Sequence, residues 1–244
     1  MRPLILLVAA AIAGLSAPAA AQRPAAVDLE LAFVVDASGS IDEEETRLQR
    51  QGYADALANP RVLKAIGSGF LRSIAVAYVE FAGPDCGRIT VDWSRISDAA
   101  SAAAFGERVL AAEPVFCPGG NAIADAVLLA AASINTNAFE GTRRVIDVSG
   151  DGPNTIGPDM ATTRDTVVAD GITINGLVIH RPSYPDLDAY YRAVITGGPG
   201  SFVIKAENRA SFGDAILRKM IREIVDRGEA DPRLARNSVK RRSE

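Results

Sequence analysis

The stretch LAFVVDASGSID, residues 31–42, joins an apolar run to a carboxylate and two hydroxyls. The apolar run is typical of a buried strand, and Asp36, Ser38 and Ser40 follow it at alternate positions. Side chains with this spacing can begin a metal site, or Ser40 can cap a helix in a capping box with Glu43. Asp36 favours the metal site, because a carboxylate that ends a buried strand needs a partner.

Apolar strands and helices alternate along the rest of the chain. The strands are expected at 29–35, 73–81, 88–93, 144–149, 172–179 and 201–205. The helices are expected at 42–58, 62–66, 98–112, 122–134, 158–170, 186–195 and 211–225, with Ser97 as the cap of the third. This order predicts an α/β fold with a doubly wound, mostly parallel central sheet and helices on both faces. The turn AGPDCG, residues 82–87, predicts a hairpin and hence one antiparallel edge strand.

The two ends of the chain are expected to lie outside this domain. Residues 1–21 have the pattern of a secretory signal peptide, with Arg2 before an apolar run and small residues at the predicted cleavage site. We expect a domain over 28–226 and a charged, disordered tail over 227–244. The protein is therefore predicted to be periplasmic or secreted, without a transmembrane segment, and to be a monomer. A net charge of −4 argues against nucleic-acid binding.

The chain has two cysteines, Cys86 and Cys117, so only one intramolecular pairing exists. In an exported protein we expect them to form a disulfide. The alternative is two free thiols.

Three loops are expected to bring oxygen atoms to one edge of the sheet, since ligands bind beyond the carboxyl ends of parallel strands. They carry, in order, Asp36 with Ser38 and Ser40, then Asn121, then Asp151. Carboxylate, hydroxyl and amide oxygens suit Mg²⁺ or Mn²⁺. Each residue also has a simpler role, because Asn121 is a good N-cap and Asp151 lies in a turn-forming sequence.

Two further residues near this edge have more than one interpretation. Asp147 lies inside the expected strand RVIDVS, residues 144–149, where a buried carboxylate needs hydrogen bonds, a cation or a proton. It is interpreted as a partnered core residue or as a residue that orients a metal ligand. His180 ends a strand at the same edge and is interpreted as a loop residue.

At these residues the sequence resembles the von Willebrand factor A domain family, over about residues 28–226. The run from Asp36 to Ser40 matches the first loop of that family's metal-ion-dependent adhesion site, and Asp151 in SGDG matches the third. Asn121 in GGNAIADA stands where the family usually has Thr. The stretch RRVIDVSGDGPN, residues 143–154, also resembles a bacterial group of exported A-domain-like proteins of unassigned function.

The resemblance implies a protein-binding module of the adhesion type, in which the cation takes an Asp or Glu of a partner protein as its last ligand. One alternative is a degenerate A domain without metal, with a structural or assembly role, which Asn121 favours. The other is a metal-assisted hydrolase, which needs a nucleophile or base besides the metal ligands. Ser38 stands where a haloacid dehalogenase-type enzyme would have a second Asp, so we expect that the protein is not an enzyme.

Overall fold

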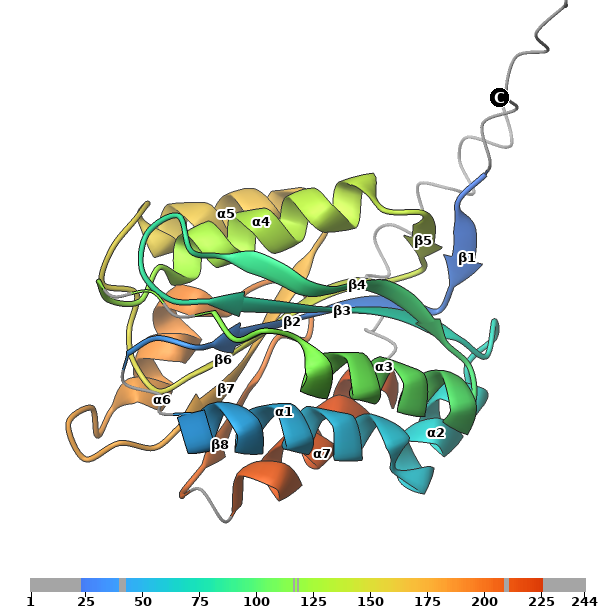
Figure 1. Ribbon diagram of the computed structural model, residues 1–244. Helices are drawn as coiled ribbons and strands as arrows, with labels where there is room; N and C mark the ends of the chain where they lie inside the picture. The colour runs from blue at the N-terminus through green and yellow to red at the C-terminus, as the bar shows by residue number, and fades with distance from the viewer. Residues whose placement is uncertain (1–22, 40–42, 116, 118, 209–210, 226–244) are drawn as a thin grey trace, which may run out of the picture.

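The computed structural model describes residues 23–39, 43–115, 117, 119–208 and 211–225 (Figure 1). The predicted signal peptide, the predicted C-terminal tail and Ser40 lie outside the described residues. Within the described part, no helix has both the length and the apolar character that a membrane span requires.

The elements follow the predicted order, with most bounds within two residues of those expected. The strands are β1 (Ala25–Val27), β2 (Leu29–Asp36), β3 (Ile74–Phe81), β4 (Arg88–Ile96), β5 (Phe139–Gly141), β6 (Arg144–Gly150), β7 (Thr173–Ile179) and β8 (Val203–Ala206). The helices are α1 (Glu43–Ala58), α2 (Pro60–Gly67), α3 (Ala99–Ala111), α4 (Ile123–Thr136), α5 (Met160–Ala169), α6 (Leu187–Tyr190), a π-helical turn η1 (Tyr191–Ile195) and α7 (Phe212–Val225).

The predicted sheet is confirmed, with the strand order β4-β3-β2-β6-β7-β8. Strand β4 pairs antiparallel with β3, and all the other pairs in this sheet are parallel. The sequence did not indicate β1 and β5, which form a separate parallel pair. Because β2, β3, β6 and β7 run in the same direction, the loops that follow them open at one edge of the sheet.

Helices cover both faces of the sheet (Figure 1). Helices α1, α3 and α7 lie on one face, and α4 and α5 lie on the other. Side chains alternate along β2, so Leu31 and Phe33 join the core under the first group of helices, and Ala32 and Val34 join the core under the second.

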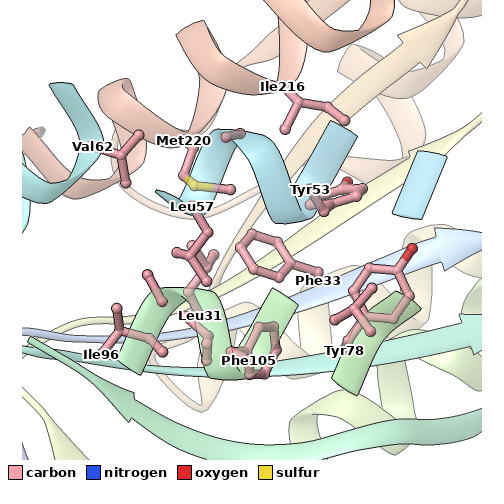
Figure 2. Packing of buried hydrophobic residues seen from close by; sticks show 14 of the residues in the cluster. Leu31, Phe33, Tyr53, Leu57, Val62, Tyr78, Ile96, Phe105, Ile216 and Met220 are labelled. Atoms are coloured by element: carbon pink, nitrogen blue, oxygen red, sulfur yellow. The ribbon is translucent and has the colours of Figure 1, made fainter. Parts of the chain in front are cut away.

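The first core fixes α1 over the central strands (Figure 2). The Tyr53 ring of α1 lies 4.8 Å from the Phe33 ring of β2 and 5.4 Å from the Tyr78 ring of β3, between ring centroids. Leu57 and Met220 pack in the same cluster. This packing holds α1 against β2 and β3.

One predicted helix cap is wrong, and the alternative role of Asn121 as a cap is not observed. Asp98, rather than Ser97, is the N-cap of α3, and it forms a capping box with Ser101. At α4 the N-cap position is Ala122, without a side-chain cap hydrogen bond. The amide oxygen of Asn154 instead accepts the backbone N–H of Ala124, at 3.0 Å. A residue from a distant loop therefore supplies the bond that Asn121 was considered for.

Candidate metal-binding site

The three predicted loops meet at one edge of the sheet. After β2, the backbone N–H of Ala37 donates to the Phe81 carbonyl at the end of β3, at 2.8 Å. Before α4, the N–H of Ala122 donates to the Ala82 carbonyl, at 2.9 Å. Strand β6 pairs with β2 in parallel, so Asp151 emerges at the same edge. The backbone of the neighbouring strands thus positions the loops that carry the candidate ligands.

Asp36 has the chemical environment of a cation ligand. The residue is 1% exposed, and its Oδ1 accepts the backbone N–H of Ser38 at 2.8 Å. Its Oδ2 is buried and has no hydrogen-bond partner among the described residues. Burial, and then the negative charge of Asp151, raise the pKa of Asp36 to about 6, against the lowering effect of its hydrogen bonds with Ser38 and the smaller lowering effect of the Asp151 backbone. A buried oxygen without a partner needs a proton or a cation.

Gly150 leaves room for this carboxylate at the end of β6. A Cβ atom at position 150 would lie 3.0 Å from Asp36 Oδ2 and 2.8 Å from the hydroxyl oxygen of Tyr191. The same hydroxyl contacts the carbonyl of Gly152, at 3.4 Å. The glycine therefore allows the third loop to approach Asp36 closely.

Asp151 is buried beside Asp36 and is ion-paired. It is 3% exposed, and its Oδ2 lies 3.1 Å from Nε of Arg181, just beyond the end of β7. The sequence analysis did not identify Arg181. A signal was available, because Arg181 directly follows His180, which was placed at this edge. The turn interpretation of Asp151 does not account for its burial beside another carboxylate.

Asn121 lies against the third loop. It is 8% exposed, and a Cβ atom on Gly152 would come within 2.5 Å of its Nδ2. Its backbone N–H donates to the Thr155 hydroxyl at 2.8 Å, and its carbonyl accepts the Thr155 N–H at 2.9 Å. These bonds fix the second loop to the third. The Asn121 side chain lies beside Gly152, the residue after Asp151, and it is not the cap of α4.

Asp147 has a partner elsewhere. It is 2% exposed, faces α7 and forms an ion pair with Lys219, which also pairs with Glu223. The structure thus gives Asp147 the contacts of a partnered core carboxylate, and the ligand-orienting role is not needed to explain its burial. His180 follows β7 as a loop residue, and its backbone N–H donates to the Ala206 carbonyl at 2.9 Å.

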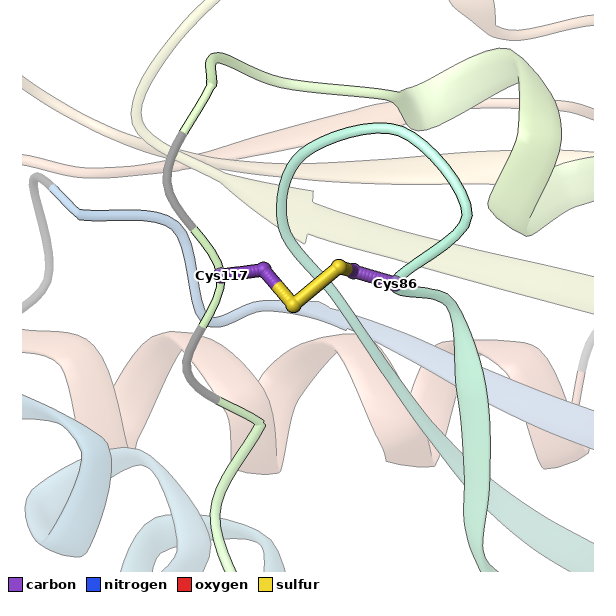
Figure 3. Close-up of a disulfide and its surroundings, with 2 residues drawn as sticks. All are labelled: Cys86 and Cys117. Atoms are coloured by element: carbon purple, nitrogen blue, oxygen red, sulfur yellow. A yellow bond between two sulfur atoms is a disulfide. The ribbon is translucent and has the colours of Figure 1, made fainter.

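The predicted disulfide is present and lies next to the site (Figure 3). Cys86 follows β3 and Cys117 precedes α4, with 6.3 Å between their Cα atoms. Both half-cystines pack against a small apolar cluster that contains Ala37, the residue after Asp36. The covalent bond therefore ties together two of the segments that border the site.

The residues present fit a hard divalent cation. Asp36 and Asp151 supply carboxylates, Ser38 a hydroxyl and Asn121 an amide oxygen, which are the donor types that Mg²⁺ and Mn²⁺ prefer. In the described part of the chain, no three side chains among His, Cys, Asp and Glu converge as a metal-binding group. A cation here would therefore depend on hydroxyl and amide oxygens and on water as well as the two carboxylates.

Comparison with known proteins agrees with the predicted fold. The family model "Protein of unknown function (DUF1194)" matches residues 26–228. No curated protein sequence matches the chain significantly. Among solved structures, proximal thread matrix protein 1 from the mussel byssus superposes with a TM-score of 0.57 and 16% identity, over 83% of this chain and 47% of that one. The same mussel protein has also been solved with a zinc-occupied MIDAS motif (TM-score 0.52, 17% identity, 80% of this chain and 46% of that one).

Two bacterial structures extend the likeness. A von Willebrand factor type A protein from Catenulispora acidiphila gives a TM-score of 0.54 at 18% identity, over 82% of this chain and 43% of that chain. The vWF domain of the type V pili tip protein Mfa5 from Porphyromonas gingivalis gives 0.55 at 10% identity, over 81% and 95%. The chain spans less than half the length of the mussel and Catenulispora chains. The chain belongs to the DUF1194 family, and its fold is that of a von Willebrand factor A domain.

Proposed function

We propose that the protein is an exported, metal-ion-dependent protein-binding module of the adhesion type. The observation that carries the proposal is Asp36 Oδ2, a buried carboxylate oxygen without a hydrogen-bond partner among the described residues. It lies at the sheet edge where the second and third loops also meet. The structural relatives include pilus and adhesion proteins, and one of them has a metal-occupied MIDAS motif.

In this proposal, different residues of the chain supply different kinds of ligand to the cation. Asp36 and Asp151 would supply charge, and Ser38, Ser40 and Asn121 would supply neutral oxygens. A bound cation, Mg²⁺ or Mn²⁺, would accept an Asp or Glu of a partner protein as its last ligand. Burial of both carboxylates keeps bulk water away and strengthens their attraction for a cation. Backbone bonds between the loops limit the reorganisation that binding requires.

We propose binding rather than catalysis. In this proposal the site residues act as metal ligands and their supports, and Ser38 stands where a phosphate-transferring enzyme of similar topology would need an acid. The predicted signal peptide and the disulfide are in keeping with a protein of the periplasm or the cell exterior.

A metal-free A domain with a structural or assembly role is the second candidate. The ion pair between Arg181 and Asp151 favours it, because it gives one of the two carboxylates a cation from within the chain.

A thermal melt of the purified protein tests the proposal. Metal is removed with a chelator, and Mg²⁺, Mn²⁺, Ca²⁺ and Zn²⁺ are then titrated separately. A ligand that binds only the folded state raises its stability by RT ln(1 + [L]/Kd), so even a weak site gives a saturable rise in Tm. The rise should disappear in Asp36→Ala and persist in the control Asp55→Ala, which changes an exposed carboxylate of α1. Absence of a rise with all four ions would support the metal-free candidate.

A further inference from the structure

Arg181 places a positive charge at the edge of the sheet that carries the candidate metal site. The sequence analysis did not identify this residue. Strand β7 pairs with β6 in parallel, with Val178 opposite Gly150, so the residues after the two strands are neighbours. Nε of Arg181 lies 3.1 Å from Oδ2 of Asp151. The Arg181 side chain is 36% exposed, whereas that of Asp151 is 4% exposed. One end of this ion pair is thus buried in the site and the other reaches solvent.

The backbone around Arg181 is fixed on both sides. The N–H of His180 donates to the Ala206 carbonyl of β8 at 2.9 Å. The carbonyl of Arg181 accepts the N–H of Tyr184 at 3.0 Å, which closes a tight turn that contains Pro182. The guanidinium is therefore held near Asp151 by a short, well-defined loop, and its side chain is partly exposed to solvent.

The two carboxylates of the site differ in how they are neutralised. Asp151 has the guanidinium of Arg181, whose Nε lies 3.1 Å from its Oδ2. Asp36 has hydrogen bonds from Ser38 and one oxygen with no partner among the described residues. A divalent cation at this edge would approach both carboxylates, and a guanidinium that stayed on Asp151 would repel it.

We propose that Arg181 is a tethered cation that competes with the divalent metal for Asp151. The inference rests on the proposed metal site and adds its regulation. Without metal, Arg181 neutralises Asp151 and stabilises the site. When metal binds, it displaces the guanidinium from Asp151. Because this displacement costs free energy, the metal affinity is lower than the oxygen ligands alone would give. Displaced Arg181 would stand at the rim of the site, where an acidic partner approaches.

A thermodynamic cycle tests this competition. Wild type, Arg181→Gln and Arg181→Lys are compared, with Arg95→Gln as a control that removes an exposed positive charge from β4, toward the opposite edge of the sheet. Each protein is melted in chelator and at saturating Mn²⁺, and its Mn²⁺ affinity is measured by calorimetry. If Arg181 and the metal are alternatives, their effects on stability cannot be additive.

We expect Arg181→Gln to have a lower Tm than wild type in chelator. At saturating Mn²⁺ the difference in Tm between the two proteins should become smaller. Its Mn²⁺ affinity should rise by about tenfold, within the usual range for coupling between two ligands. Arg181→Lys and Arg95→Gln should stay near wild type. If wild type binds Mn²⁺ and Arg181→Gln binds it no more tightly, the competition is overturned and the proposed function stays intact.

The remaining outcomes separate the two proposals. Mn²⁺ binding by Arg181→Gln but not by wild type would support the competition and overturn metal dependence in the natural protein. No Mn²⁺ binding by either protein would overturn both.

Discussion

Arg50 of α1 and Glu80 of β3 form a two-point ion pair inside the domain. Nε and Nη2 of Arg50 lie 2.7 and 2.8 Å from the two carboxylate oxygens, and the side chains are 5% and 1% exposed. Arg50 also donates to the Ala112 carbonyl, and Glu80 accepts the Val115 N–H at 3.3 Å. The pair therefore holds the segment that leads to the second loop of the candidate site.

Breaking one side of this pair should be costly. Glu80→Gln leaves the buried Arg50 guanidinium without its countercharge, and we expect a loss of about 3–5 kcal/mol in the free energy of unfolding. The double variant Arg50→Met/Glu80→Met should recover much of this loss, since apolar replacements of buried pairs are often tolerated. Urea unfolding measures both. A loss below about 1 kcal/mol in Glu80→Gln would show that the pair contributes little.

The disulfide should stabilise the loops around the site. It closes a loop with a sequence separation of 31 residues, for which loop-closure entropy gives about 3–4 kcal/mol. We expect Cys86→Ser/Cys117→Ser to lose about this much stability and to bind metal more weakly, since the cluster around Ala37 loses its covalent tie. Urea unfolding and calorimetry are the measurements. Two titratable thiols in the denatured, unreduced wild-type protein would contradict the disulfide itself.

A buried charge cluster under α7 should make stability depend on pH. Lys219 pairs with both Asp147 and Glu223, and Asn175 donates to Glu223 at 3.1 Å. Burial, and then the negative charge of Asp147, raise the pKa of Glu223 from 4.5 to about 7, against the lowering effect of Lys219 and Asn175. Between these values the folded protein keeps a proton that the unfolded chain has lost. Stability from Glu223 is therefore full below about pH 4.5 and falls as the pH rises to about 7.

Glu223→Gln should remove this dependence. Above about pH 7 the variant should be more stable than wild type, by at most about 3 kcal/mol, and near about pH 4.5 the two should converge. Calorimetric melts across this range in chelator test the expectation, with the exposed Glu107→Gln as control. A difference between variant and wild type that does not change with pH would contradict it.

The sequence predicted the sheet and the meeting of the three loops because strand order and apolar periodicity are local signals. It did not predict β1 and β5, which are three residues each and carry no periodicity. The sequence also did not predict side-chain contacts between residues that are distant in the chain. Arg181 reaches Asp151 from another strand end, and Asn154 supplies the bond at α4 that Asn121 was considered for. Lys219 and Glu223 lie among apolar residues on the buried face of α7, where the sequence analysis did not expect charged side chains.

Asn121 offers the sharpest test of the ligand set. Asp has nearly the same shape as Asn, so Asn121→Asp keeps the packing against Gly152 and adds a negative charge next to the loop that carries Asp151. If the side chain at position 121 reaches the cation, metal affinity should rise by about tenfold, because affinity grows with the number of charged ligands. Stability in chelator should fall, because three carboxylates then share one buried edge. Calorimetric titration of Mn²⁺ and melts in chelator measure the two effects, with the exposed Asn208→Asp as a charge-matched control. Unchanged affinity together with reduced stability would place Asn121 beside the site but outside the coordination of the metal.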